Sequence, residues 1–310
     1  MMKNNLLITV MIATYNRCDK LKLALEGLVK QSFDKDKFEV WVIDNNSTDD
    51  TVGRVKEYQD RLNLHYYLET KQGLGHARDA GFRKARGEYV AFLDDDAIPT
   101  EDFLQSLYEN ICEHEPDCVC GPIIPYYTSE KPHWFKDEYE IRSLGSDWHI
   151  VPEGSTHSGS NMTWKRSVLS DLGGFNVNLG VSGDRFIPGE DSDLFYRYWR
   201  AKTGKVVYDP KIEVLHWTPA YKMRVSYILK RFLSVGVLAA KLNHNVNFVK
   251  KILRALQLFF EIIASLIIFP FTFFRHKYLE NWVIEEGRRV VVRVGEFIAM
   301  IGIEPRILQK

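Results

Sequence analysis

Residues 6–121 repeat one pattern, in which a short apolar run is followed by a polar turn and then by a stretch with helical periodicity. The runs lie at 6–13, 38–43 and 64–68, and a fourth run at 89–93 ends at three consecutive aspartates. Runs that are apolar throughout are typical of strands buried on both faces of a parallel sheet. We therefore predict an α/β protein with a Rossmann-like, doubly wound and mostly parallel sheet, whose polar strand ends meet at one edge.

Helix boundaries in this region are predicted from capping residues. Asp19 is expected to cap a helix at 20–30, and Ser47 or Thr48 is expected to cap the helix that follows the second strand. A glycine-rich turn, Gly73-Leu74-Gly75, precedes the next helix. It departs from the dinucleotide-binding fingerprint because Arg78 stands where the third glycine would be.

Composition limits the possible partners of the chain. Its 310 residues contain 41 Lys and Arg and 41 Asp and Glu, so no net positive field favours nucleic acid, and we expect no nucleic-acid partner. The N-terminus lacks an apolar signal region, which predicts a cytoplasmic protein. The four cysteines lack Cys-x-x-Cys spacing and are predicted to be free thiols; they are Cys18, Cys112, Cys118 and Cys120.

Asp94, Asp95 and Asp96 form a carboxylate cluster at the end of the fourth run. Such a cluster needs a compensating cation, and oxygen ligands suit Mg²⁺ or Mn²⁺, which also bind substrate phosphates. A solvated acidic turn is the alternative that these residues alone leave open. A calcium loop is disfavoured, since Ile98 and Pro99 occupy a ligand position and the position that needs glycine.

The second half of the chain contains further polar candidates. Residues 122–159 are irregular and rich in aromatic side chains, which predicts a loop that packs over the site. A return strand is expected at 158–164, and Glu190 and Asp191 precede a helix predicted at 194–201. His216 follows the last short strand of this part.

The C-terminal region differs in character, because residues 255–274 are apolar apart from a few positions that include Glu261. A membrane-spanning helix needs ~20 apolar residues, so this segment is at the threshold. Basic residues flank both of its ends, which favours a segment that enters one leaflet and returns. A spanning helix and a soluble lid or dimer interface remain alternatives, and the apolar run 290–303 is a candidate partner for the segment.

Five motifs, in this order, resemble those of family 2 inverting glycosyltransferases, which have the GT-A fold of the nucleotide-diphospho-sugar transferase superfamily. The motifs are Thr14-Tyr15-Asn16-Arg17, Asp44-Asn45-Asn46-Ser47, Gly75-His76-Ala77-Arg78, Leu93-Asp94-Asp95-Asp96 and Gly189-Glu190-Asp191. The resemblance covers residues 6–216. It implies a nucleotide-sugar-binding half at 1–121, an acceptor and catalytic half at 122–222, and a helical region that attaches to a membrane at 223–310.

The resemblance also implies roles for individual residues. Asp191 would be the base and Glu190 would orient a substrate, while Asp96 and Asp94 would bind the metal with Asp95 as their support. Asp44 would accept a hydrogen bond from uracil, with Thr14 and Arg17 beside the base. Contacts to the nucleotide sugar are further implied for Tyr15, Asn46, Gly75, Arg78 and Asn161, a metal or diphosphate contact for His216, and a diphosphate contact for Arg224, Lys230 and Arg231.

The implied activity is metal-dependent, inverting transfer of a sugar from a nucleotide-diphosphate donor, expected to be a UDP-sugar, to a glycan or lipid-linked acceptor. We expect this to occur in polysaccharide or glycoconjugate synthesis, at the inner face of the cell membrane. No Gln-x-x-Arg-Trp motif is present, which favours single transfers over polymerisation. A sugar nucleotidyltransferase would need a glycine-rich loop at 14–17, and a noncatalytic nucleotide-sugar-binding protein would not need both metal and base candidates.

Overall fold

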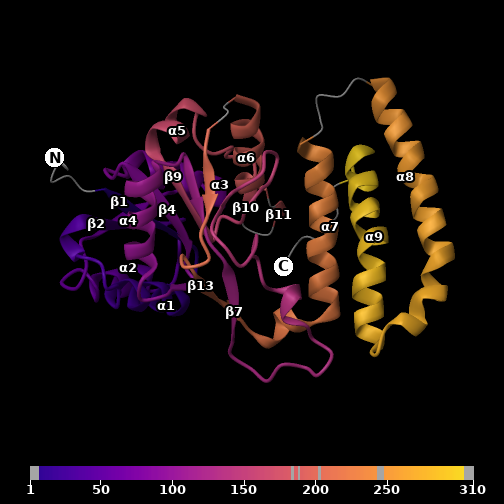
Figure 1. Ribbon diagram of the computed structural model, residues 1–310, viewed down its shortest axis with the longest axis horizontal. Coiled ribbons are helices and arrows are strands. Elements are labelled where there is room, and N and C mark those ends of the chain that lie inside the picture. Colours follow the sequence, from indigo (N-terminus) through magenta and orange to yellow (C-terminus); the bar gives the residue numbers. More distant parts are fainter. Residues whose placement is uncertain (1–6, 183–184, 188, 202–203, 243–247, 304–310) are drawn as a thin grey trace. The chain divides into compact units, whose positions relative to one another are not determined.

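The computed structural model describes residues 7–182, 185–187, 189–201, 204–242 and 248–303 (Figure 1). The chain forms two compact units. The first contains the chain up to Tyr126, Glu140–Leu179 and Glu190–Trp217, and the second contains Tyr127–Tyr139, Gly180–Gly189 and Thr218–Lys310. The chain therefore enters the second unit three times. The predicted division at 121 and 222 into nucleotide-sugar and acceptor halves remains a prediction about function.

The main sheet of the first unit has eight strands, in the order β3-β2-β1-β4-β9-β6-β12-β8. The pairs β3–β2, β2–β1, β1–β4 and β6–β12 are parallel, whereas β9 is antiparallel to β4 and β6. The prediction of a mostly parallel α/β sheet is confirmed, and the return strand is β9. The strands are β1 (Ile8–Thr14), β2 (Phe38–Asp44), β3 (Leu64–Leu68), β4 (Tyr89–Asp94), β6 (Cys118–Cys120), β8 (His149–Ile150), β9 (Asn161–Lys165) and β12 (Val206–Tyr208).

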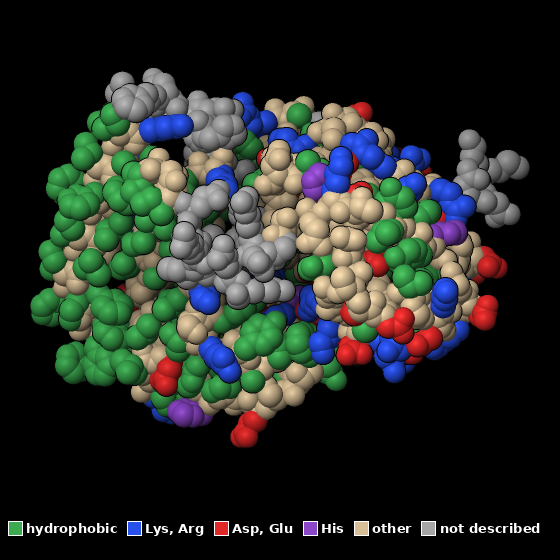
Figure 2. All heavy atoms as spheres, turned by 180° about the vertical axis from the view of Figure 1, so that it is seen from behind, with side chains coloured by type: hydrophobic (Ala, Val, Ile, Leu, Met, Phe, Trp, Pro, Cys, Tyr) green, Lys and Arg blue, Asp and Glu red, His purple; other side chains and the backbone are tan. Residues whose placement is uncertain are grey.

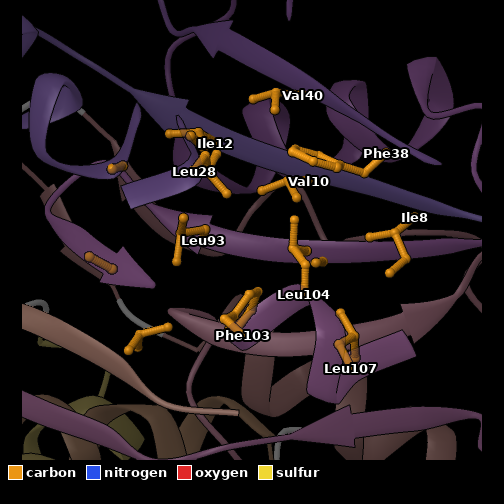
Figure 3. Close-up of a cluster of buried hydrophobic side chains, with 14 of the residues drawn as sticks. Ile8, Val10, Ile12, Leu28, Phe38, Val40, Leu93, Phe103, Leu104 and Leu107 are labelled. Carbon is orange, nitrogen blue, oxygen red and sulfur yellow. The ribbon is translucent and has the colours of Figure 1, made fainter. Parts of the chain in front are cut away.

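Two hydrophobic cores, one on each face of this sheet, show that it is doubly wound. Ile8, Val10 and Ile12 of β1 pack with the helices α1 and α4, whereas Met11 belongs to a separate core with α3, α5 and α6. Figure 3 shows the first core, where β1 and β2 face Leu104 and its neighbours on α4. The helices are α1 (Cys18–Val29), α2 (Thr51–Lys56), α3 (Leu74–Lys84), α4 (Phe103–His114), α5 (Arg166–Asp171) and α6 (Glu190–Ala201).

The predicted caps of the first two helices were wrong. Helix α1 begins at Cys18, so Asp19 lies in its first turn, and α2 is capped by Asp50, which accepts a hydrogen bond from the Gly53 amide at 3.1 Å. Ser47 and Thr48 bond to Asn16 instead: the Asn16 amide donates to Ser47 Oγ at 2.9 Å, and the Thr48 amide donates to Asn16 Oδ1 at 2.6 Å. These bonds tie the turn after β1 to the turn after β2.

A three-stranded sheet, β5-β13-β7, brings distant segments together in the first unit. The strands are β5 (Ala97–Pro99), β7 (Ile123–Tyr127) and β13 (Val214–Thr218). Because β13 is antiparallel to β5, His216 lies opposite Ala97, immediately after the aspartate cluster. The segment 122–159 is thus more ordered than predicted, since it contains β7, β8 and the short helix η2 (Asp137–Tyr139).

The second unit is mainly helical. Helix α9 packs against both α7 and α8, and a side chain at Gly295 of α9 would meet the Cα of Gly236 of α7 at 3.3 Å. The aromatic segment 127–139 belongs to this unit: the Asn281 side chain of α9 donates to the Trp134 carbonyl and to the Tyr139 hydroxyl, each at 2.7 Å. The elements are β10 (Gly180–Ser182), β11 (Arg185–Ile187), η3 (Ala220–Met223), α7 (Val225–Leu242), α8 (Phe248–Ile268), η4 (Phe269–Arg275) and α9 (Leu279–Met300).

One segment of the described chain, Lys250–Arg275, is long and apolar enough to cross a membrane, and few of its residues are buried. Figure 2 shows its hydrophobic side chains gathered along one side of this unit. The run predicted at 290–303 lies mostly in α9 and does pack against α8.

Candidate functional site

The site begins where β1, β2 and β4 end. In the parallel register Thr14 pairs with Asp44, and Ala13 pairs with Asp94, so these three strand ends meet at one edge of the sheet. Ligands of open α/β sheets bind at this carboxyl edge. The structure thus brings the first, second and fourth predicted motifs together, as expected.

A possible metal site is formed by Asp94, Asp96 and His216, which offer ligand atoms within 4.8 Å of one another. His216 Nε2 lies 3.1 Å from Asp96 Oδ1 and 3.9 Å from Asp94 Oδ2. The Trp217 amide also donates to the Asp96 carbonyl at 2.9 Å, which fixes β13 beside the cluster. Two carboxylates and one imidazole fit a divalent ion such as Mn²⁺, which accepts oxygen and nitrogen ligands.

The alternative of a solvated acidic turn is wrong, because the side chains of Asp95 and Asp96 are 4% and 3% exposed. Arg17 contacts both carboxylates, with nitrogen–oxygen distances of 2.8 Å to Asp95 and 2.5 Å to Asp96. The Thr14 hydroxyl donates to Asp95 at 2.8 Å. Burial raises the pKa of Asp95 to about 7, against the lowering effect of Arg17. Thr14 and Arg17 therefore contact the aspartates, and their expected place beside a nucleobase remains a prediction.

The buried Arg78 connects Asp94 of the possible metal site with Glu190 at the start of α6. Its guanidinium lies 3.0 Å from Asp94 Oδ1 and 2.5 Å from Glu190 Oε1. Although burial lowers the pKa of Arg78, the charges of Glu190 and Asp94 outweigh it and raise that pKa. Burial also raises the pKa of Glu190 to about 7, and Arg78 limits that rise. Arg78 thus pairs with protein carboxylates, and its implied contact with the nucleotide sugar remains a prediction.

Asp191 follows Glu190 in the first turn of α6, which begins four residues before the predicted start. Asp191 Oδ2 accepts a hydrogen bond from the Gly159 amide at 2.9 Å, and Oδ1 accepts one from the Ser192 amide at 2.7 Å. The side chain remains partly exposed. It can therefore accept a proton from a bound molecule, as a general base requires.

Gly159 and Ser160 were missed by sequence reasoning. The Ser160 hydroxyl donates to Asp94 Oδ2, and Gly159 binds Asp191 as described. A glycine and a serine before a strand cannot be recognised as site residues from the sequence, because their hydrogen-bond partners come from other segments of the chain.

The region around Asp44 is the candidate nucleobase site. Asp44 is buried, and its carboxylate accepts hydrogen bonds from the Ser47 amide and the Tyr66 hydroxyl, each at 2.8 Å. Each carboxylate oxygen has a second lone pair that can accept a further donor. Tyr66, on β3, was missed because its role depends on the pairing of β3 with β2. Asn46 is exposed, with φ of 67°.

Two predicted ligand-binding residues have structural explanations instead. A side chain on Gly75 would lie 2.6 Å from the Leu179 carbonyl oxygen and 2.8 Å from that of Asn176, so close backbone packing requires this glycine. Asn161 is 1% exposed, and its side chain donates to the backbone carbonyls of two neighbouring segments at 3.0 and 2.7 Å. Its position therefore does not support a sugar contact.

The remaining predicted residues are placed as follows. Tyr15 is 38% exposed at the end of β1. Arg224, Lys230 and Arg231 belong to the second unit, where Arg231 donates to the Tyr139 carbonyl at 2.5 Å. Their predicted contact with a diphosphate remains a prediction.

Sequence comparison identifies relatives of the chain. The family model described as Glycosyl transferase family 2 matches residues 9–173. A glucosyl-dolichyl phosphate glucuronosyltransferase of Haloferax volcanii is 25% identical over 234 residues, which cover 72% of this chain and 73% of that protein. The poly(ribitol-phosphate) beta-N-acetylglucosaminyltransferase TarS of Staphylococcus aureus is 38% identical over 113 residues, which cover 36% of this chain and 20% of TarS.

Solved structures show the same fold. The mannosyltransferase PcManGT of Pyrobaculum calidifontis, in complex with GDP-Man and Mn²⁺, superposes with a TM-score of 0.64 at 20% identity and covers 93% of this chain and 86% of that one. TarS 1–349 with UDP-GlcNAc superposes with a TM-score of 0.57 at 20% identity and covers 95% of this chain and 81% of that one. These likenesses confirm the GT-A fold. With the family match over more than half of the chain, they lead to one conclusion: this protein belongs to glycosyl transferase family 2 and is an enzyme that transfers glycosyl groups.

Proposed function

We propose that this enzyme is a metal-dependent, inverting glycosyltransferase that moves a sugar from a nucleotide-diphosphate donor, a UDP-sugar, to a glycan or lipid-linked acceptor. The observation that carries the proposal is the presence of two separate sets of carboxylate side chains at one sheet edge. Asp94 and Asp96 lie with His216 in one cluster, and Asp191 lies beyond Arg78 and Gly159. Donor activation and proton removal need two such separate groups.

Asp96, His216 and Asp94 would hold the divalent ion, Mn²⁺ or Mg²⁺, and the imidazole favours Mn²⁺. The bound ion supplies Lewis-acid chemistry that offsets the negative charge developing on the departing diphosphate. Arg17 forms ion pairs with Asp95 and Asp96, and Asp95 supports Asp96 by holding the Arg17 guanidinium in place.

Asp191 acts on the acceptor side. The acceptor hydroxyl oxygen forms a bond to the anomeric carbon, its proton passes to Asp191, and the bond from that carbon to the diphosphate oxygen breaks. This single displacement inverts the anomeric centre. Glu190, held by Arg78, orients the acceptor or the donor sugar.

The nucleobase is proposed to bind at Asp44, which would accept the imide N–H of uracil. The Tyr66 hydroxyl and the Ser47 amide hold this carboxylate in place. PcManGT binds GDP-Man and TarS binds UDP-GlcNAc, so the fold itself permits more than one base. Asp44 suits uracil because its carboxylate can accept the imide N–H, which cytosine and adenine lack.

The acceptor is proposed to lie at a membrane surface. The protein would attach to this membrane through α8 and η4, which would enter it from one side. Leu253, Phe260 and Ile267 are 60%, 65% and 63% exposed, and burying each in lipid would contribute roughly 1.5–3 kcal/mol. Two charged residues of α8, Glu261 and Arg254, pair with α9 instead. Arg293 Nε donates to Glu261 Oε2 at 2.7 Å, and Arg254 Nε donates to Glu296 Oε1 at 2.9 Å.

This arrangement favours in-plane insertion into one leaflet over a span, because only one side of α8 is apolar and exposed. Lys250, Lys251, Arg275 and Lys277 flank the segment and suit anionic headgroups at the cytoplasmic face. The Haloferax relative is described as acting on glucosyl-dolichyl phosphate, a lipid-linked glycan, which supports the same acceptor class here. Synthesis of a polysaccharide or glycoconjugate at the inner face of the cell membrane follows.

The donor is tested by incubating the full chain with a panel of nucleotide sugars and measuring release of the nucleoside diphosphate with Mn²⁺, with Mg²⁺ and with EDTA. We expect one uridine sugar to exceed the others and EDTA to abolish its turnover. Equal turnover with EDTA would refute metal dependence, and preference for a guanosine sugar would refute the uridine donor. Preference for a cytidine or adenosine sugar, whose base has no ring N–H to donate to a carboxylate, would refute the role of Asp44.

Membrane attachment is tested by flotation with vesicles that contain anionic phospholipid. The triple variant Leu253→Ser, Phe260→Ser and Ile267→Ser should stay with the soluble fraction while the wild type floats. Val52→Ser, at a 42% exposed site on α2, is the control and should float like the wild type. Flotation of the triple variant, or a stable dimer of the wild type that does not bind vesicles, would contradict the proposal.

A further inference from the structure

We propose that Gly159 and Ser160 are positioning residues that hold Asp94 and Asp191 in a fixed relation to each other. This inference rests on the proposed function, in which Asp94 serves the donor and Asp191 serves the acceptor. Neither residue would touch substrate. Their role would be to couple the orientation of the metal-binding carboxylate to that of the base.

The two residues contact both carboxylates at once. The Ser160 hydroxyl donates to Asp94 Oδ2, and the Gly159 amide donates to Asp191 Oδ2 at 2.9 Å. Because Gly159 and Ser160 are consecutive, one planar peptide and a few rotatable bonds beside it separate the two hydrogen bonds. A displacement of this peptide would therefore move both carboxylates.

Strand pairing places Ser160 opposite Asp94. Strand β9 runs antiparallel to β4 with Asn161 opposite Leu93, so the next residues in register are Ser160 and Asp94. Ser160 is 6% exposed, so its hydroxyl has little access to water. The bond is thus set by strand pairing and not by a mobile surface contact.

A second set of contacts, made by Arg78, also links Asp94 to the start of α6. Arg78 binds Asp94 through Oδ1, and it also binds Glu190, the neighbour of Asp191. A methyl group on Gly159 would overlap the guanidinium of Arg78, so close packing requires glycine at 159. Asp94 is consequently held at both oxygens, and rotation of its carboxylate is restricted.

This geometry has a chemical consequence. Hydrogen-bond partners of metal-ligating carboxylates fix their orientation, and their loss typically costs 10–100-fold in metal affinity or activity. A misplacement of about 1 Å between reacting groups can cost about 100-fold in rate. Ser160 should therefore control metal affinity, and Gly159 should control the rate of transfer through Asp191 and Arg78.

The test compares Ser160→Ala, Ser160→Thr and Gly159→Ala with the wild type. Ser170→Ala is the control, because Ser170 is exposed on α5 and its hydroxyl bonds only within its own helix in the described contacts. Two quantities are measured for each: the Mn²⁺ concentration that half-saturates binding, followed by electron paramagnetic resonance of free Mn²⁺, and kcat with the preferred donor.

We expect Ser160→Ala to raise the half-saturating Mn²⁺ concentration about tenfold while Ser160→Thr, which keeps the hydroxyl, stays within about twofold of the wild type. Gly159→Ala should lower kcat about tenfold or more, and it should also weaken Mn²⁺ binding, because displacement of Arg78 releases Asp94 Oδ1. Ser170→Ala should match the wild type in both quantities.

Wild-type Mn²⁺ binding by Ser160→Ala would overturn the inference, as would equal losses in Ser160→Ala and Ser160→Thr, which would indicate a packing defect. A wild type that binds Mn²⁺ but turns over no nucleotide sugar would overturn the proposed function, and the Mn²⁺ titration would still decide the role of Ser160. If the wild type binds no Mn²⁺, both proposals fail.

Discussion

Replacing Arg78 by Met should destabilise the first unit strongly, because Arg78 forms ion pairs with two carboxylates from a site that is 3% exposed. Breaking a buried ion pair by removing one partner typically costs about 3–5 kcal/mol. Asp94 is 30% exposed and can be rehydrated, so we expect the lower end, about 3 kcal/mol at pH 7. The measurement is the free energy of unfolding in urea, followed by tryptophan fluorescence.

The loss should depend on pH in one direction. Arg78 lowers the pKa of Glu190, so its removal raises that pKa above the value of about 7. The folded protein then binds a proton that the unfolded chain, with a pKa of 4.5, has already released. Stability of the variant therefore recovers as the pH falls, and the deficit should be smaller at pH 5.5 than at pH 8.

Arg83→Met is the matched control, since Arg83 lies on the same helix and pairs with Asp79 at the surface. Exposed pairs of this kind contribute about 0.3–0.5 kcal/mol. If Arg78→Met and Arg83→Met lost the same small amount, or if the Arg78→Met deficit grew at low pH, the account of Arg78 as a buried connection would be refuted.

Three further predictions concern other parts of the first unit. Glu39→Gln should lower the free energy of unfolding by about 2 kcal/mol at pH 7, because the buried Glu39 accepts hydrogen bonds from Arg86. Those hydrogen bonds outweigh burial and lower the pKa of Glu39. Urea unfolding should therefore show that the difference from the wild type shrinks as the pH falls below the unfolded pKa of 4.5. Tyr66→Phe should weaken UDP binding about fivefold in calorimetry, since it releases Asp44. Gly75→Ala should lower the free energy of unfolding by about 1–3 kcal/mol through overpacking against two carbonyl groups. A pH-independent loss in Glu39→Gln, unchanged UDP affinity in Tyr66→Phe, or wild-type stability in Gly75→Ala would each contradict its prediction.

The strands were predictable because their apolar runs are uninterrupted. β3 has the predicted bounds, and β2 and β4 each differ by one residue. Helix starts were less predictable: several polar residues precede α1 and α2, and tertiary bonds from Asn16 engage Ser47 and Thr48. A local capping rule cannot anticipate a partner about 30 residues away.

The candidate site could be predicted best where its residues end or follow an apolar strand, as Asp94 and Asp96 do at the end of β4, whereas His216 lies within β13. Asp94, Asp96 and His216 were expected to bind metal, and the structure brings them within reach of one ion. The partners of these residues could not be predicted. The pairing of Arg17 with Asp96 joins residues 79 positions apart, and the contact of Ser160 depends on the antiparallel register of β9.

The aromatic residues of 127–139 illustrate the same limit. Their number indicated packing, but the sequence did not reveal that they pack with Ile284 and the other helical residues of the second unit. The sheet was predicted from periodicity within single segments, whereas these contacts depend on pairs of segments that lie far apart in the chain.

The most direct test of the central claim is the rate of sugar transfer by Asp191→Asn, measured with the donor that the panel identifies and with Mn²⁺ and UDP binding determined in parallel. Asparagine keeps the size of the side chain but cannot take the acceptor proton. We predict that the variant binds Mn²⁺ and UDP like the wild type and transfers sugar about 100-fold more slowly or worse. Transfer at the wild-type rate would contradict the assignment of Asp191 as the base and, with it, the proposed mechanism.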